Sequence, residues 1–379
     1  MSDGASLTRA DVGTLRIGTR GSALATTQTG HVAEELASLV DRSVSAVRIR
    51  TDGDVLTGSL AAMGGTGVFV TALRQAILDG RCDAAVHSLK DLPVAPLPGL
   101  TMIIPSREDP RDALCGRSGV GVETLPVGAR VGTGSPRRGA QLLVLRGDLE
   151  LVDIRGNVDT RLSRVLGPGA DLDAVVLAYA GLSRLGLTGS AAQVLDPEVM
   201  TPAAGQGALA LEVRSDLLSD PGVAAALAAI DDAPTRLAVI AERAILEALS
   251  AGCAAPVGAY ASLHTVSTGA LQGEGALQGG GSVREPLGTG LSGATLRLSA
   301  VVVALDGSAQ LRRSGETVLS AESWEVDAAE LARRALAGEP LRGAAEAAAR
   351  DLGCRVAEEL LAGGAAGIAP LGLTKDSAW

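Results

Sequence analysis

Arginines that follow predicted strands are the residues of this sequence best suited to bind an anion. Residues 130–164 contain seven arginines and four acidic residues, although the whole chain has a net charge of −10. Arg137 and Arg138 follow the strand-like segment ARVGT, Arg155 follows LELVDI, and Arg20 follows LRIGT in an earlier, similar unit. Ligands of open α/β sheets bind at the carboxyl ends of strands, and guanidinium groups hold carboxylates bidentately. Each arginine alone is better explained as a surface ion pair, but the set of four predicts a site for a ligand with several carboxylates.

The segment AVHSLKD places a second group of polar side chains at the end of a predicted buried strand. Lys90 is one of only two lysines in the chain, the other being Lys375. A Ser-x-Lys nucleophile or a lysine Schiff base is one interpretation of Ser88 and Lys90. A simple ion pair between Lys90 and Asp91 is the other. A carboxylate that faces arginines, here Asp91, is also a candidate acid, base or stabiliser of a cation.

Cys253 lies in SAGCAAPVGAYA, where small neighbours leave room for a bulky group at its sulfur. A free cysteine is usually a small buried hydrophobic residue, and this interpretation is kept for Cys82, Cys115 and Cys354. From the local sequence alone, a functional thiol at Cys253 is the less favoured interpretation. The four cysteines are far apart and form no CxxC pair, so no disulfide framework and no metal site are expected.

The elements that must position these residues alternate between strand and helix from residue 15 to about 210, with a restart after REDPRDALCG. This alternation predicts two similar α/β domains, and the later alternating strands with an alanine-rich helix predict a smaller α+β domain. Eight glycines in residues 269–290 predict a flexible insertion. The expected organisation is a disordered N-terminus (1–14), domain 1 (15–107 and 205–228), domain 2 (108–204), domain 3 (229–366) and a tail (367–379).

Composition excludes several classes of protein. The chain has 379 residues, a net charge of −10 and five aromatic residues, which argues against nucleic-acid binding. No apolar run reaches the roughly 20 residues of a membrane span, and the first residues lack the apolar core of a signal peptide. A cytoplasmic protein is therefore expected. Neither GxGxxG nor a P-loop motif is present, so a nucleotide site has little support.

Nine sequence blocks, in order from about residue 15 to 262, resemble the porphobilinogen deaminase (hydroxymethylbilane synthase) family. They are IGTRGSALA, TDGD, GGTGVFVTALRQAILDGRCDAAVHSLKDLP, REDPRDAL, VGTGSPRRGAQL, IRGNVDTRL, LAYAGLSRLGL, PAAGQGALALE and ERAILEALSAGCAAPVGAYA. The resemblance implies two α/β domains built like periplasmic binding proteins (type II), joined by a hinge that the chain crosses twice. It also implies an α+β third domain with a three-stranded antiparallel sheet.

The activity that the resemblance implies is the condensation of four porphobilinogens, with loss of four ammonias, into the linear tetrapyrrole hydroxymethylbilane. Such an enzyme is a transferase of porphyrin and heme biosynthesis, expected here as a cytoplasmic monomer without nucleic-acid or membrane partners. By the same matching of blocks, a dipyrromethane cofactor is joined to Cys253 by a thioether, and Asp91 contacts pyrrole nitrogens and assists ammonia loss. The implied cofactor- and substrate-binding residues are Arg20, Ser22, Lys90, Thr133, Ser135, Arg137, Arg138, Arg155, Arg161, Arg184 and Gln206.

Two positions depart from the family pattern. Thr66 stands where members often have lysine, and Gly134 stands where a serine is common. Neither change removes Asp91, Cys253 or the arginines, so activity is expected to survive. The alternative function is that of a two-lobed protein that binds an anionic solute without catalysis, which would not need Cys253 or a third domain.

Overall fold

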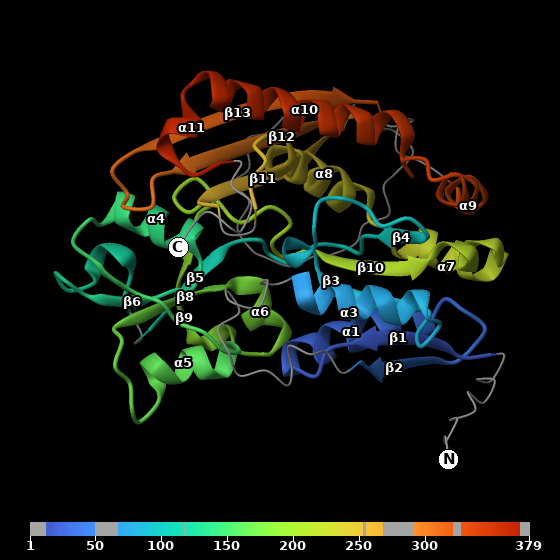
Figure 1. The fold of residues 1–379 in the computed structure, drawn as a ribbon, viewed down its shortest axis with the longest axis horizontal. Coiled ribbons are helices and arrows are strands. Elements are labelled where there is room, and N and C mark those ends of the chain that lie inside the picture. The colour runs from blue at the N-terminus through green and yellow to red at the C-terminus, as the bar shows by residue number, and fades with distance from the viewer. Residues whose placement is uncertain are drawn as a thin grey trace, which may run out of the picture.

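The computed structural model describes residues 13–49, 67–116, 119–252, 255–267, 291–320 and 327–371. In this part of the chain the strands form two five-stranded sheets and one three-stranded sheet (Figure 1). We call the units built on them lobe 1, lobe 2 and domain 3. Lobe 2 lies on the left of Figure 1, lobe 1 on the right, and domain 3 covers both from above.

Lobe 1 is built on a mixed sheet with strand order β2-β1-β3-β10-β4. β1 runs parallel to β2 and β3, and β10 runs antiparallel to β3 and β4. The first helix begins where Ser22 caps it, since the Ser22 hydroxyl accepts a hydrogen bond from the Ala25 amide. The elements are β1 (Leu15–Thr19), α1 (Ala23–Ala37), β2 (Val44–Arg48), α3 (Gly67–Leu78), β3 (Ala84–Ser88), β4 (Leu100–Ile103), β10 (Leu209–Arg214) and α7 (Pro221–Ile230).

Lobe 2 repeats this plan with strand order β7-β6-β8-β5-β9. β6 is parallel to β7 and β8, and β5 is antiparallel to β8 and β9. Ser135 caps α4 and Pro136 is its first residue, a favourable position for proline because its missing N–H would have no helical partner. The elements are β5 (Asp112–Gly116), β6 (Arg130–Gly132), α4 (Pro136–Leu145), β7 (Glu150–Val152), α5 (Val158–Leu166), β8 (Ala174–Ala178), α6 (Tyr179–Arg184) and β9 (Ala191–Leu195).

Domain 3 packs helices on one face of an antiparallel sheet with order β11-β12-β13. Its core contains alternate residues of the strands, such as Leu296 and Leu298, packed against Leu237, Ile245 and the alanine-rich α10. The elements are α8 (Ala233–Ala248), β11 (Val257–Ser267), β12 (Leu291–Val303), β13 (Gln310–Leu319), α10 (Gly343–Ala362) and α11 (Ala365–Ile368). The predicted fold class is confirmed by these three sheets.

Two segments pack differently from the sequence expectation. Helix α9 (Ala328–Leu336) was assigned to domain 3, but its Leu331 and Ala335 are buried in the core of lobe 1. Residues 367–371 were assigned to the tail, yet Ala365 and Ala369 lie one turn apart in the core of domain 3. The exact domain boundaries otherwise stay predictions, and the segment 269–290 lies outside the described residues.

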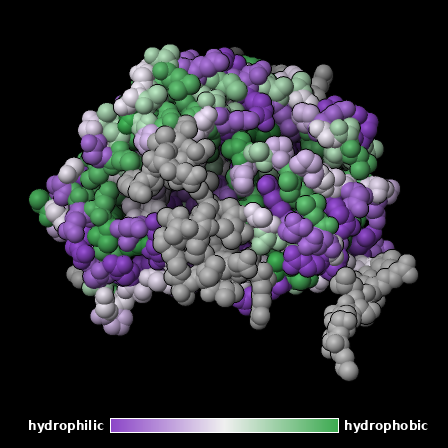
Figure 2. Space-filling model, viewed as in Figure 1, coloured by the Kyte–Doolittle hydropathy of each residue, from purple (hydrophilic) through white to green (hydrophobic). Residues whose placement is uncertain are grey.

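The surface seen in Figure 2 mixes hydrophilic and hydrophobic side chains over the described elements. Within the described ranges, no helix is long and apolar enough to cross a membrane.

Candidate active site

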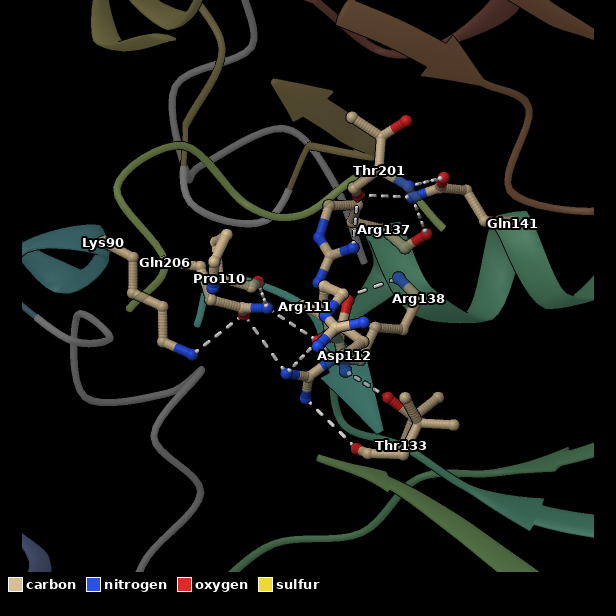
Figure 3. Close-up of polar contacts among 12 residues, drawn as sticks. Lys90, Pro110, Arg111, Asp112, Thr133, Arg137, Arg138, Gln141, Thr201 and Gln206 are labelled. Carbon is tan, nitrogen blue, oxygen red and sulfur yellow. Dashed lines mark hydrogen bonds and ion pairs between the residues drawn. The ribbon is translucent and has the colours of Figure 1, made fainter. Parts of the chain in front are cut away.

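A buried carboxylate, Asp112 at the start of β5, is the centre of the polar cluster in Figure 3. Its side chain is fully buried, and its Oδ2 atom lies 2.7 Å from Nη2 of Arg137. Nε of Arg138 donates to Oδ1 at 2.9 Å, and Nε2 of Gln206 donates to the same oxygen at 2.8 Å. The first turn of α4 thus delivers both arginines to one acid, because Ser135 starts the helix just before them.

Gln206 connects this cluster to lobe 1. Its Oε1 atom accepts from Nζ of Lys90 and from Nη2 of Arg138, both at 3.3 Å. Lys90 lies in the short 3-10 turn that follows β3, whereas Arg138 belongs to lobe 2. The side chains predicted at the strand ends of the two lobes therefore meet at one amide.

Positive charge exceeds negative charge in this cluster, because three cations surround one carboxylate. Burial by itself would raise the pKa of Asp112, but the charges of Arg137 and Arg138 outweigh it and lower the pKa to about 2. Burial, together with the charge of Arg138, lowers the pKa of Lys90 to about 8. An excess of buried cations is costly unless an anion neutralises it. The cluster is therefore suited to bind carboxylates.

Residues around the N-terminus of α4 shape one side of the cluster. Thr133 is buried, and its hydroxyl accepts from the Ser135 amide at 3.2 Å. At Gly134, an added Cβ would lie 2.5 Å from the carbonyl oxygen of Ile154. A larger residue at this position, such as the serine common in the family, would therefore require the segment after β7 to shift.

Asp91 and Arg161 are electrostatic neighbours of the cluster. Asp91 is half-buried in the 3-10 turn beside Lys90, and its charge acts on both Lys90 and Arg161. Burial and the nearby Arg138 and Arg155 lower the pKa of Arg161, which shows that cationic groups gather here. Arg155 itself is 60 % exposed and pairs with Asp153 at 3.1 Å.

The remaining predicted residues occupy different surroundings. Arg184 is half-buried, and its Nη2 atom donates to the carbonyl of Gly207, next to Gln206. Arg20 and Ser22 are half-buried at the carboxyl end of β1, where Ser22 serves as the cap of α1. Cys253 and Thr66 lie outside the described residues.

Sequence reasoning missed Asp112 and a second buried acid, Glu242 of α8. Glu242 accepts from Nη1 of Arg107 at 2.6 Å and from the backbone amides of Gly205 and Ala261. Arg107 also donates to the carbonyl of Gln206 at 2.8 Å. These contacts tie both chain crossings between the lobes to domain 3. The signal for Asp112 was its place in the block REDPRDAL, but no local pattern indicated its partners.

A separate cavity of about 880 Å³ lies between the sheet of domain 3 and residues 196–198 of lobe 2, with Tyr260 and Arg312 in its lining. The lining contains none of the predicted site residues, so this cavity is distinct from the cationic cluster around Asp112. Within the ranges described above, no group of three or more His, Cys, Asp or Glu could hold a metal ion.

Two α/β lobes joined by two crossings, with cations from both lobes at the junction, define a two-lobed protein built to hold an anionic ligand. Two family models identify it further: "Porphobilinogen deaminase, dipyromethane cofactor binding domain" matches residues 15–219, and "Porphobilinogen deaminase, C-terminal domain" matches residues 236–274. The chain belongs to the porphobilinogen deaminase family, whose members are transferases.

Curated relatives agree with this assignment. A porphobilinogen deaminase of Micrococcus luteus is 50% identical over 93% of this chain and 93% of its own length. Those of Cutibacterium acnes and Leifsonia xyli are each 48% identical, over 94% and 95% of this chain and 97% and 95% of their own lengths. A methionine-binding protein of known structure is 13% identical, with a TM-score of 0.36 over 57% of this chain and 89% of that chain. The fold assignment depends on the strand orders and not on this last likeness.

Proposed function

We propose that this chain is a hydroxymethylbilane synthase, which condenses four porphobilinogens on a dipyrromethane primer and then releases hydroxymethylbilane by hydrolysis. Membership of the family and relatives that carry this name support the proposal. The observation that carries it is the junction of Lys90, Arg138 and Gln206, where both lobes supply groups to one cationic cluster. Each porphobilinogen carries two carboxylates, so a growing chain of pyrroles needs such a cluster.

The described residues fit a dipyrromethane with acidic side chains. Two nitrogens of Arg137 are engaged, by Asp112 and by the Thr201 carbonyl, but its Nε atom is buried without a hydrogen-bond partner in the described part of the chain. A buried donor without a partner is costly, and a carboxylate oxygen would satisfy it. The surplus of cations over Asp112 favours the same occupant.

Distinct roles follow for the residues around the cluster. Arg137, Arg138 and Arg161 would hold carboxylates, and Lys90 would add a charge from lobe 1. Asp91 would stabilise the positive charge that develops on the porphobilinogen as its ammonia departs, because a preorganised carboxylate is most effective in a site with little water. The further residues proposed to line the same site are Arg20, Ser22, Thr133, Ser135, Arg155, Arg184 and Gln206.

Cys253 is proposed as the residue that holds the dipyrromethane, through a thioether. When bound, this group supplies the primer to which the substrate units are added. A tethered primer makes each addition a reaction between held partners, for which effective molarities of about 10⁵ M or more are reached at ideal alignment. Cys82 and Cys115 are poor candidates, since burial raises the pKa of their thiols to about 11 and about 12.

The alternative of a solute-binding protein without catalysis is not favoured, because the match to the family extends to the C-terminal domain that a simple receptor would not need. We also propose that the protein works as a cytoplasmic monomer with porphobilinogen as its substrate and without nucleic-acid partners. The net charge of −10 supports the last point.

Mass spectrometry of the purified full chain tests the proposed function. We expect an intact mass that exceeds the sequence mass by two pyrrole units, with the modified peptide containing Cys253, and production of hydroxymethylbilane from porphobilinogen. Cys253→Ala should lose both. Cys82→Ala, Cys115→Ala and Cys354→Ala are the matched controls and should keep both. A wild-type chain of bare mass that makes no bilane would overturn the proposal.

A further inference from the structure

Thr201, at the start of the second crossing between the lobes, forms hydrogen bonds with all its polar atoms. The residue is fully buried. Its carbonyl accepts from Nη1 of Arg137 at 2.6 Å and from Nε2 of Gln141 at 3.0 Å, and its amide donates to Oε1 of Gln141 at 2.8 Å. Its hydroxyl donates to the carbonyl of Pro197 at 3.1 Å. The backbone of Thr201 thus fixes two side chains of α4, the helix that contains Arg137 and Arg138.

Domain 3 contacts Thr201 through Arg312 of β13. Nη1 of Arg312 donates to the Thr201 hydroxyl at 2.7 Å, and Nη2 donates to the carbonyl of Glu198 at 3.0 Å. The two acceptors are three residues apart in the chain, so one planar guanidinium fixes both ends of the turn between them. The Arg312 side chain is half-buried in the wall of the 880 Å³ cavity.

Strand β11 packs closely against Thr201 through Gly258. A Cβ added at Gly258 would lie 2.7 Å from the Thr201 carbonyl oxygen, which is the oxygen that Arg137 contacts. Val301 and Val303 of β12 also pack against Ala140 of α4. All three strands of domain 3 therefore contact either α4 or Thr201.

We infer that Arg312 is a positioning residue for the anion site: it fixes Thr201, and Thr201 fixes the orientation of Arg137. This inference rests on the proposed function for the identity of the anion, a carboxylate of a pyrrole chain. Domain 3, to which Cys253 belongs, thus receives a second role. Its strand β11, which begins at Val257, and Arg312 of β13 set the geometry of the arginines. A displacement of about 1 Å at such a site can cost up to a hundredfold in rate.

The test compares Arg312→Met with Thr201→Val and with the double variant. Each single variant removes the contact but keeps the size of the side chain, and Arg297→Met is the matched control. Arg297 lines the same cavity from β12, is 63 % exposed and pairs only with Glu316 among its described ion-pair partners. Steady-state kinetics with porphobilinogen, melting temperature and deuterium uptake of the α4 peptides are measured for all four variants and for the wild type.

We expect Arg312→Met and Thr201→Val each to raise the KM for porphobilinogen about fivefold or more and to speed deuterium exchange in α4. The double variant should add less than twofold to either one, because each single variant already breaks the contact that the two side chains share, from Nη1 of Arg312 to the Thr201 hydroxyl. Arg297→Met should stay within about twofold of the wild type. A purely structural role would lower the melting temperature and leave KM unchanged, which would overturn the inference, as would independent effects in the double variant.

Deuterium exchange separates failure of the inference from failure of the proposed function, because it needs no substrate. Should the wild type make no bilane, the proposed function fails, and faster exchange in α4 of Arg312→Met would still support the positioning contact. Unchanged exchange in α4 of that variant would refute it, whatever the activity.

Discussion

Each lobe contains one antiparallel strand with a buried acid, and the two acids differ in their partners. In lobe 1, Glu212 of β10 is held by Nη2 of Arg74 at 2.8 Å and lies 3.3 Å from Nε2 of His87. In lobe 2, Asp112 of β5 is held by Arg137, Arg138 and Gln206. Both acids are almost fully buried, and the contacts outweigh burial and lower both pKa values to about 2.

The difference lies in the charge that remains after pairing. Glu212 has a single arginine partner, Arg74, and the two charges of this pair balance each other. Asp112 has two arginines, and Lys90 reaches the same Gln206 amide from the other lobe. A neutral buried pair supports the fold, whereas a surplus of cations at a junction is stabilised only by an anion. Charge balance, and not position in the sheet, therefore distinguishes the proposed binding site from its counterpart in lobe 1.

The largest effect is expected from Asp91→Asn. In the proposed function, lobe 2 supplies most of the anion-binding groups, and lobe 1 supplies the Asp91 carboxylate that would stabilise the developing positive charge. Removal of its charge should lower kcat by at least about a hundredfold with little change in melting temperature. Quenched-flow or steady-state assays of bilane formation measure this. A variant that keeps more than a fifth of the wild-type kcat would contradict the role of Asp91.

The second effect separates buried from exposed arginines within lobe 2. Arg138→Leu removes a buried fork and should cost about 2 kcal/mol in transition-state binding, or roughly thirtyfold in kcat/KM. Arg155→Leu should cost less than about threefold, because Arg155 is 60 % exposed. Equal losses of kcat/KM at Arg138 and Arg155 would show that burial of an arginine does not determine its contribution to catalysis.

The third prediction tests the two acids directly. Asp112→Asn and Glu212→Gln should each lower the free energy of unfolding by about 3 kcal/mol, because each leaves a buried cation unpaired. Only Asp112→Asn should also raise KM, by roughly tenfold, as the arginines lose their orientation. Urea unfolding and kinetics measure the two quantities. A similar rise in KM for Glu212→Gln would contradict the assignment of a purely structural role to Glu212.

These acids also predict an acid limit of stability. Their pKa values are lowered in the folded chain, so their stabilising contribution is complete above the ordinary carboxyl pKa, near 4, and is lost as the pH falls towards 2. The wild type should therefore lose stability over this range more steeply than Asp112→Asn.

The smallest effect concerns the pH dependence of substrate binding. The pKa of Lys90 is lowered to about 8, so its charge is present below this pH and disappears above it. We expect the KM for porphobilinogen to rise about two- to threefold between pH 7 and pH 9, since one cation of several is lost. In Lys90→Met this rise should be absent, with KM high at both values. An identical profile in wild type and variant would exclude Lys90 as a source of the dependence.

The fold class and the strand-end cations could be predicted from the sequence because both follow from local patterns. Alternation of strands and helices indicated the two lobes, and the arginines after the segments ARVGT and LELVDI indicated the cationic strand ends. The partners could not be predicted in this way. Asp112 meets Arg137 25 residues away, and Arg312 meets Thr201 111 residues away. The burial of each arginine could not be predicted from the sequence either. Arg138 and Arg155 were therefore equally good candidates for anion binding, although Arg138 is buried and Arg155 is exposed.

The strand order of lobe 1 has a consequence for the order in which the nascent chain can fold. β3 ends at Ser88, but its antiparallel neighbour β10 begins only at Leu209. At 5–20 residues per second, the ribosome needs about 6–24 s to synthesise the intervening segment. The strands of lobe 2, in contrast, all lie between Asp112 and Leu195 and can pair among themselves during that time. Lobe 2 is thus able to fold first, while the edge of β3 must be kept from aggregation until β10 emerges.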